Sequence, residues 1–201
     1  MDLWQYEKEA VAAGYQTVCG CDEAGAGPLA GPVYAAAVIL PPGVEIPGLN
    51  DSKKLTEKRR KALFPVIQER AAAWSVAFVD AEEIDRTDIL SARIRAMQLA
   101  IDGLAVRPDF ALIDGNRDCG QSAAINACHR CIVKGDSLSA SIAAASVLAK
   151  VSRDAFMEEM DLRYPEYSFA RHKGYGTALH YERLREYGPC PIHRRTFLKR
   201  L

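Results

Sequence analysis

The 201-residue sequence has no long apolar run, and this absence argues against a membrane-spanning protein. An apolar stretch such as residues 35–40 is far shorter than the roughly 20 residues that a spanning helix needs. The first nine residues carry several charges and lack the apolar segment typical of a secretory signal. From these two absences we expect a cytoplasmic protein.

The chain also has no excess of one charge, because 26 Lys and Arg balance 26 Asp and Glu. The distribution is less even: from Arg171 to Leu201, eight Lys or Arg stand against two Glu, a net charge of +6. A basic end on an acidic body fits a phosphate backbone held beside metal-binding carboxylates. A solvated helix surface would show the same charge pattern.

A second Cys-x-x-Cys pair is missing from the sequence, which contains six cysteines. Without a secretory signal, we expect these cysteines to be reduced thiols. A zinc site is the alternative, formed by Cys119, Cys128, His129 and Cys131. Zinc patterns of this kind need two pairs at a matching spacing, so the sequence favours buried thiols.

Apolar residues make up 49% of the chain and charged residues 26%, as in a folded domain with a substantial core. No internal repeat or linker is visible. We therefore expect a single domain over residues 1–201, in which residues 161–201 form a helical, basic C-terminal part.

Hydrophobic patterning predicts strands at residues 17–23, 33–40, 74–79, 110–113 and 128–133. Helices are predicted at residues 56–70, 88–104, 139–160 and 177–187, and Pro65 should kink or split the first of them. The helix at 139–160 begins with small side chains, which allow close approach to a neighbour. This order of elements predicts a mixed α/β layer domain with a helical C-terminal part.

Four carboxylates stand where β-like runs end, each near a glycine-containing turn: Asp22, Glu23, Asp114 and Asp136. If those strands are neighbours in one sheet, their ends form one acidic cluster. Clustered acids repel one another at pH 7, and bound Mg²⁺ or Mn²⁺ relieves the repulsion because these ions prefer oxygen ligands. Each acid taken alone is more typical of a turn or a helix cap.

The segments around these acids carry a resemblance to a known family. They include Cys-Asp-Glu-Ala-Gly-Ala-Gly-Pro at 21–28 and Asn-Asp-Ser-Lys-Lys-Leu at 50–55. Further segments are Ile-Asp-Gly at 113–115, residues 134–137 with 141–154, 172–177 and 193–197. In order and over nearly the whole chain, they resemble the motifs of the ribonuclease HII family.

The resemblance implies a ribonuclease H-like fold, that is, a mixed sheet flanked by helices. It implies an endonuclease that hydrolyses the RNA strand of RNA–DNA hybrids and incises duplex DNA at single ribonucleotides, leaving 5′-phosphate and 3′-hydroxyl ends. Asp22, Glu23, Asp114 and Asp136 would be the catalytic and Mn²⁺- or Mg²⁺-binding residues. The absence of a further domain before the first motif argues against the related ribonuclease HIII type, and we expect a monomer.

The resemblance also implies how the substrate is bound. Gly25, Ala26, Gly27 and Tyr175 would read the 2′-hydroxyl group that distinguishes RNA from DNA. Glycines let backbone amides approach a sugar closely, and tyrosine offers a flat ring and a hydroxyl. Candidate phosphate contacts are Asn50, Ser52, Lys53, Arg171 and Lys173.

One residue departs from the family pattern, because Ala26 stands where the family usually has arginine. The loss of this cation favours one alternative, a protein that binds RNA–DNA hybrids with impaired turnover. Another alternative is a different nuclease of the same fold, such as a junction resolvase. The Gly-x-Gly turn and Tyr175 argue against the resolvase, because an enzyme specific for DNA has no 2′-hydroxyl to read.

Overall fold

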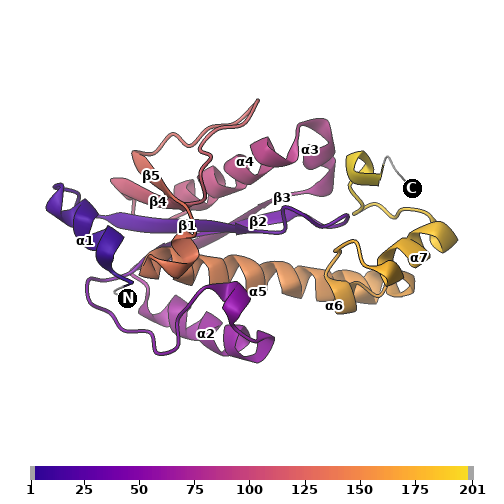
Figure 1. Cartoon of the computed structure of the whole chain (residues 1–201), viewed down its shortest axis with the longest axis horizontal. Helices are drawn as coiled ribbons and strands as arrows, with labels where there is room; N and C mark the ends of the chain where they lie inside the picture. Colours follow the sequence, from indigo (N-terminus) through magenta and orange to yellow (C-terminus); the bar gives the residue numbers. More distant parts are fainter. Residues whose placement is uncertain (1–2, 199–201) are drawn as a thin grey trace.

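The computed structural model describes residues 3–198 and contains a five-stranded mixed sheet between two layers of helices (Figure 1). The strands are β1 (Val18–Ala24), β2 (Val33–Ile39), β3 (Ala73–Val79), β4 (Phe110–Asp114) and β5 (His129–Ile132). Their order is β3-β2-β1-β4-β5, with β1 antiparallel to β2 and parallel to β4. The five predicted strands and the mixed α/β layer architecture are confirmed.

Seven α-helices accompany the sheet in the described chain. They are α1 (Gln5–Ala12), α2 (Glu57–Arg70), α3 (Ala81–Arg86), α4 (Ile89–Asp102), α5 (Ala140–Arg163), α6 (Phe169–His172) and α7 (Ala178–Tyr187). Helices α3 and α4 cover one face of the sheet, and α2 and α5 cover the other (Figure 1). Short 3-10 turns lie at Ser52–Lys54 (η1), Gly135–Ser137 (η2), Pro165–Tyr167 (η3) and Arg195–Leu198 (η4).

Strand β2 shows why both faces of the sheet are covered. Successive side chains of a strand point to opposite faces. Ala35 and Ala37 pack in the core beneath α4, whereas Ala36 and Val38 pack in the core beneath α2 and α5. All four side chains are fully buried, so β2 is covered on both of its faces. A shift of the strand by one residue would keep apolar side chains on both faces, but each side chain would pack against different neighbours.

Helix α5 lies unusually close to β1 because small residues meet at their contact. A Cβ atom on Gly20 would lie only 2.2 Å from the backbone nitrogen of Ile142, so no larger residue fits there without movement. The first part of α5 offers Ala143, Ala144 and Ala145, all fully buried. This contact confirms the close approach predicted from the small side chains of residues 139–160.

The helix ends follow the expected capping chemistry. Thr56 accepts a hydrogen bond from the Arg59 N–H at the start of α2, and Thr177 accepts one from the His180 N–H at the start of α7. Of the two predicted effects of Pro65, the split is wrong, because α2 is continuous through this residue, and the kink stays a prediction. Proline removes only one helical hydrogen bond, and the burial of Leu63 and Ile67 offsets that loss.

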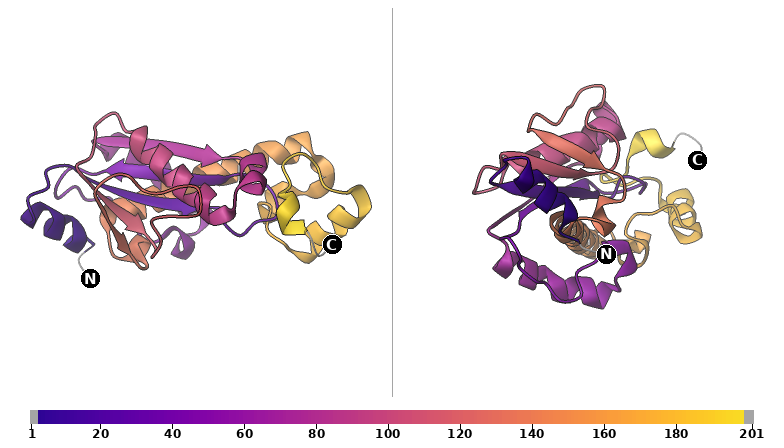
Figure 2. Two further views of the ribbon diagram at one scale, coloured as in Figure 1. Left: turned by 90° about the horizontal axis from the view of Figure 1, so that it is seen from above. Right: turned by 60° about the vertical axis from the view of Figure 1, so that its left-hand side comes forward.

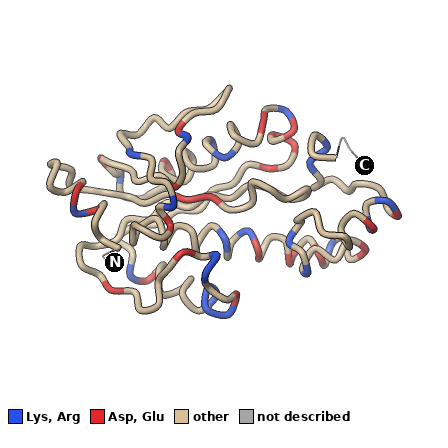
Figure 3. Tube along the Cα trace, in the orientation of Figure 1, with Lys and Arg blue, Asp and Glu red and all other residues tan. Residues whose placement is uncertain are grey.

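The C-terminal part is helical, as predicted, and lies at the far end of α5 from α1 (Figure 2). It does not form a purely positive surface, because basic and acidic segments alternate along it (Figure 3). Lys173, for example, is paired with Glu158 of α5 at 2.8 Å. Among residues 3–198, no helix is long and apolar enough to cross a membrane.

Candidate active site

Two of the predicted acids meet where parallel strands end at the same edge of the sheet. The register of β1 against β4 pairs Cys21 with Ile113. Asp22 and Asp114 are the next residues on the two strands, so their side chains lie next to each other. Asp22 is buried, with 3% of its surface exposed, and Asp114 is half-buried.

Asp136 lies next to Asp114, but in a 3-10 turn and not at the end of a strand as the sequence suggested. It does not close β5, which ends at Ile132, but lies in the 3-10 turn η2. Lys134 adopts a left-handed backbone (φ 60°) before this turn and redirects the chain. The Asp136 N–H then donates to Asp114 Oδ1 at 3.3 Å.

The three aspartates form one cluster of oxygen ligands. Asp22, Asp114 and Asp136 each offer a carboxylate oxygen within 4.8 Å of the other two. Burial raises the pKa of Asp22 well above its ordinary value, and the charges of Glu23 and Asp114 raise it further. Burial and then the Asp114 charge also raise the pKa of Asp136. The raised pKa values mean that ionising all of these acids together is unfavourable in this buried place. A bound cation would offset that repulsion.

Glu23 lies beside this cluster but is held by a different partner. Its Oε1 atom is 2.6 Å from Nη2 of Arg93 on α4. Burial raises the pKa of Glu23, while Arg93 acts in the opposite direction. The second oxygen, Oε2, is buried and has no hydrogen-bond partner in the described chain. Glu23 therefore has one oxygen available for a ligand while the other remains paired.

One lysine reaches the cluster from the loop that precedes α2. Lys53 Nζ lies 3.2 Å from Asp136 Oδ2, although 77% of the lysine side chain is exposed. Burial lowers the pKa of the Lys53 ammonium, but Asp136 and the other two aspartates outweigh this effect and raise it overall. Lys53 thus stays protonated at the edge of the cluster.

The donor set fits hard divalent cations. Mg²⁺ and Mn²⁺ bind carboxylate oxygens, and the cluster offers three such groups with a fourth, Glu23, alongside. The buried, unpartnered Oε2 of Glu23 is a further oxygen that lacks a hydrogen-bond donor. The residues present therefore suit a metal centre of oxygen ligands.

The glycine-rich turn after β1 lies next to Tyr175. A Cβ atom on Gly27 would be 4.0 Å from Cε1 of the Tyr175 ring, and both residues are exposed. Gly25 has a left-handed backbone (φ 98°), and a Cβ there would clash with Arg153. The structure thus brings Gly27 close to Tyr175, two of the residues predicted to read the 2′-hydroxyl group.

Two buried arginines, to which the sequence analysis gave no role, support this turn. Arg194 donates to the carbonyl oxygens of Gly25 (2.6 Å), Ala26 (2.9 Å) and Gly31 (2.9 Å). Arg153 donates to three more carbonyl oxygens, those of Ala30, Pro32 and Lys173. Both lay inside the segments that resembled family motifs. The glycine-rich loop itself could have indicated their role. Its backbone carbonyl groups need hydrogen-bond donors where they are buried, and arginine side chains can supply them.

A group of buried histidines holds the backbone of Tyr175. His180 donates from Nδ1 to the Tyr175 carbonyl at 2.9 Å, and its Nε2 lies 2.9 Å from Nε2 of His193. His193 Nδ1 accepts from the Cys190 N–H at 3.0 Å. The Tyr175 N–H donates to the His172 carbonyl. This network fixes the position from which the tyrosine ring extends.

The predicted phosphate contacts differ in how accessible they are. Asn50 and Arg171 are exposed, and Lys53 is exposed beside Asp136. Ser52 is buried, with its N–H donating to Ser146 Oγ, so its side chain is not presented to solvent. Lys173 is only 14% exposed in its side chain and is bound to Glu158.

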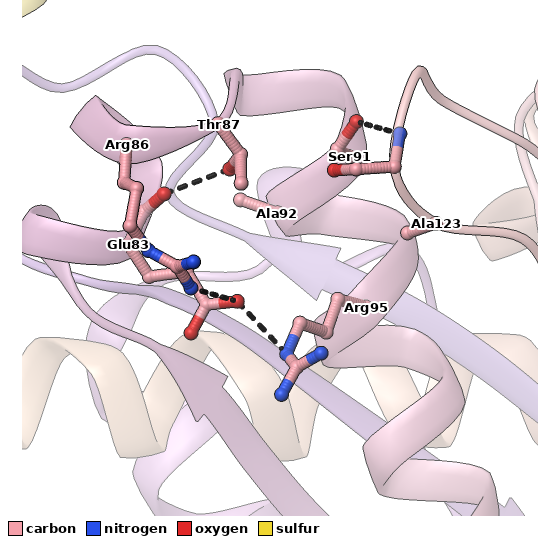
Figure 4. A pocket seen from close by; sticks show the side chains of 8 residues that line it. Glu83, Arg86, Thr87, Ser91, Ala92, Arg95 and Ala123 are labelled. Atoms are coloured by element: carbon pink, nitrogen blue, oxygen red, sulfur yellow. Dashed lines mark hydrogen bonds and ion pairs between the residues drawn. The ribbon is translucent and has the colours of Figure 1, made fainter.

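A cavity of about 140 Å³ between α3 and α4 is not part of this site. Its charged groups are already paired, since Glu83 contacts Arg95 at 2.9 Å and Arg86 at 3.6 Å (Figure 4). The Ser122 N–H donates to Ser91 Oγ at its other end. None of the acids of the cluster lines it.

Comparisons with known proteins identify the family and the fold. A family model described as Ribonuclease HII matches residues 19–200. Ribonuclease HII of Acetivibrio thermocellus is 53% identical over 199 residues, which cover 99% of this chain and 76% of that protein. The crystal structure of ribonuclease H2 from Pyrococcus horikoshii OT3 has a TM-score of 0.74 at 27% identity, covering 90% of this chain and 93% of that one. The fold is also similar to that of Bst-RNase HIII in complex with Mn²⁺, with a TM-score of 0.62 at 24% identity, covering 89% of this chain and 65% of that one.

Proposed function

Because the chain belongs to the ribonuclease HII family, we propose that it is an endonuclease that cuts the RNA strand of RNA–DNA hybrids and incises duplex DNA at single ribonucleotides. The observation that carries the proposal is the cluster of Asp22, Asp114 and Asp136, connected through the end of β1 to the turn in which Gly27 lies close to the exposed Tyr175. The cluster supports hydrolysis, and the turn supports recognition of a ribose.

The proposed catalytic and metal-binding residues are Asp22, Glu23, Asp114 and Asp136. Mn²⁺ or Mg²⁺ bound there would activate a water molecule and stabilise the charge on the leaving oxygen. The carboxylates of the three aspartates would hold this ion at their edge of the sheet. Lys53, protonated at the edge of the cluster, would contact the reacting phosphate.

The chemistry is a displacement at phosphorus. The oxygen of water forms a bond to phosphorus, the bond to the 3′-oxygen breaks, and the 3′-oxygen takes up a proton. The products would be a 3′-hydroxyl and a 5′-phosphate. In this step Arg93 would keep Glu23 ionised, because it lies 2.6 Å from that carboxylate.

Selectivity would come from the turn rather than from the acids. The backbone of Gly25, Ala26 and Gly27 would hydrogen-bond the 2′-hydroxyl, and the exposed ring of Tyr175 would stack on the ribose. Arg153 and Arg194 donate hydrogen bonds to backbone carbonyl oxygens in and after this turn. The backbone amides of the turn would therefore be in place before the substrate binds. Ala26 presents only a methyl group where a cation could contact substrate.

Cleavage of a labelled RNA–DNA hybrid with Mn²⁺, with Mg²⁺ and with chelator tests this proposal. We expect cleavage with either ion, none with chelator, and a loss of at least about a thousandfold for Asp22→Asn. Asp102→Asn, a change at an exposed acid at the end of α4, serves as the matched control. Equal activity of the two variants would contradict the proposed role of the cluster.

A further inference from the structure

A second group of potential metal ligands lies on the connection between β4 and β5. Asp118, His129 and Cys131 each offer an oxygen, nitrogen or sulfur atom within 4.8 Å of the other two. His129 and Cys131 are two residues apart on β5, so their side chains point to the same face of the sheet. Asp118 is exposed and the other two are half-buried, so ions in solution can reach the group.

The loop that carries Asp118 has a defined backbone. The Ile125 N–H donates to the Asp118 carbonyl at 2.8 Å, and the Gly120 N–H donates to the Ala123 carbonyl at 2.7 Å. Cys119 forms an isolated β-bridge with Ala124. The Cys119 thiol donates a hydrogen bond to the Asp118 carboxylate, which lowers the pKa of that carboxyl. Cys119 thus neighbours the group through Asp118, although its sulfur is not among the atoms that lie within 4.8 Å of one another.

The histidine is oriented in the way that metal ligands require. His129 Nδ1 lies 2.8 Å from the Ala127 carbonyl, which can only accept, so Nδ1 carries the hydrogen. In the neutral ring the lone pair of Nε2 then faces Asp118 Oδ2 at 3.4 Å. Either a proton on Nε2 or a metal ion can bridge these two atoms, and a metal ion would use the same lone pairs. Histidines that bind metals commonly donate their other ring nitrogen to a backbone carbonyl in this manner.

We propose that Asp118, His129 and Cys131 bind one Zn²⁺, and that the neighbouring Cys119 supplies the fourth ligand when the ion is bound. Thiolate and imidazole ligands favour Zn²⁺, whereas Mg²⁺ and Mn²⁺ favour the oxygen-only cluster at Asp22. Zinc bonds of about 2.0–2.3 Å place tetrahedral ligands about 3.4–3.8 Å apart. The separation of 3.4 Å between His129 Nε2 and Asp118 Oδ2 already has this value.

Zinc at this position would have a structural role. It would link the loop of residues 115–128 to β5, and that loop begins directly after Asp114 of the acidic cluster. Four protein ligands leave no open position for chemistry, as in other structural zinc sites. Binding would release the thiol protons and would stabilise the folded chain, because the unfolded chain lacks the assembled site.

The proposed site differs from the zinc site that the sequence analysis considered, which included Cys128 and not Asp118. Cys128 points elsewhere, with its Sγ 3.3 Å from the Tyr15 hydroxyl, and Asp118 takes its place. The sequence analysis favoured buried thiols, which is wrong for Cys119 and Cys128, since both are exposed. Cys128 thus provides a matched control: a neighbouring exposed thiol of the same chain that does not belong to the site.

Cobalt and zinc titrations of the reduced, metal-free protein in excess Mg²⁺ test the proposal. Excess Mg²⁺ would compete for the carboxylate cluster, and Co²⁺ bound to thiolate gives a sulfur-to-metal absorption band that carboxylates cannot produce. We expect this band at one Co²⁺ per chain, its displacement by one equivalent of Zn²⁺, and its presence in Cys128→Ser. Cys131→Ser and His129→Ala should lower the affinity for Zn²⁺ by more than about a hundredfold, as measured against a chromophoric chelator.

Circular dichroism of the metal-free variants shows whether they are folded. The proposal is overturned if the folded wild-type chain gives no thiolate band with Co²⁺. It is also overturned if Cys128→Ser lowers Zn²⁺ affinity as much as Cys131→Ser does. The outcome is independent of nuclease activity, because the assay measures only metal binding.

Discussion

The guanidinium of Arg93 lies 2.6 Å from the carboxylate of Glu23 and balances the charge of this mostly buried acid. Removing the arginine leaves an ionised group in a poorly hydrated place. We expect Arg93→Met to lower the free energy of unfolding of the metal-free protein by about 3 kcal/mol. Mn²⁺ should recover part of this loss, because it supplies the missing positive charge.

Chemical denaturation with and without Mn²⁺ measures this effect. Arg95→Met is the control, since Arg95 lies two residues along α4 and pairs with Glu83 at a more exposed position. Equal losses of stability in the two variants would show that Arg93 does not have the proposed role.

Asp22→Asn should have opposite effects on cleavage and on metal-free stability. Burial and neighbouring acids raise the pKa of Asp22, so folding favours its protonated form over the charged one. A carboxyl whose folded pKa is raised loses stability as pH rises through that pKa. At pH 7 the neutral amide should therefore raise the free energy of unfolding of the metal-free protein. A variant that is both inactive and less stable without metal would argue against electrostatic repulsion in the cluster.

Arg194→Lys should weaken the glycine-rich turn. Arginine donates three hydrogen bonds to carbonyl oxygens of this turn, and a lysine ammonium at the same place cannot reach all three. With each such bond contributing about 1.5–3 kcal/mol, we expect a loss of about 3 kcal/mol or more in urea denaturation. Arg195→Lys changes the neighbouring exposed arginine and should cost far less.

The buried histidines predict a specific dependence of stability on pH. Burial lowers the pKa of His180 and of His193 to about 4, from an ordinary value of 6.5. The unfolded chain therefore takes up protons in this range that the folded chain does not, and stability falls as pH decreases from about 6.5 to about 4. The wild type should lose more stability over this range than His193→Gln does, as measured by denaturation at each pH. Parallel curves would contradict this assignment.

Ala26→Arg should increase substrate affinity or turnover. A hydrogen bond from a charged donor contributes about 1.5–3 kcal/mol, so kcat/KM should rise by about ten- to a hundredfold if the new side chain contacts the substrate. Ala26→Gln, which has a long side chain without charge, is the matched control. An arginine variant no better than the glutamine variant would show that the missing cation is not limiting.

Much of the fold could be predicted from the sequence because the strands are strongly patterned. Val33 to Ile39 is apolar on both faces, and Thr56 and Thr177 mark helix starts through ordinary capping chemistry. The short helices α1 and α3 were not predicted. Helix α3 has only six residues, and α1 has a weak apolar face, so tertiary contacts rather than local patterning stabilise both.

The sequence predicted which residues form the candidate site, but not all of the contacts that position them. The cluster of Asp22, Asp114 and Asp136 follows from strand ends, yet the η2 turn that carries Asp136 depends on a left-handed Lys134 that no pattern indicates. The pairing of Glu23 with Arg93 could not be predicted, because Arg93 comes from a helix 70 residues later in the chain. Contacts of this kind arise from packing and have no local sequence signal.

Cleavage of a matched pair of DNA duplexes, one of which contains a single ribonucleotide, tests the central claim most directly. In the presence of Mn²⁺ or Mg²⁺, we expect one cut on the 5′ side of the ribonucleotide and none in the all-DNA duplex. The upstream fragment should end in a 3′-hydroxyl and the downstream fragment should begin with a 5′-phosphate. Cleavage of both duplexes, or binding to the ribonucleotide duplex without any cut, would contradict this account.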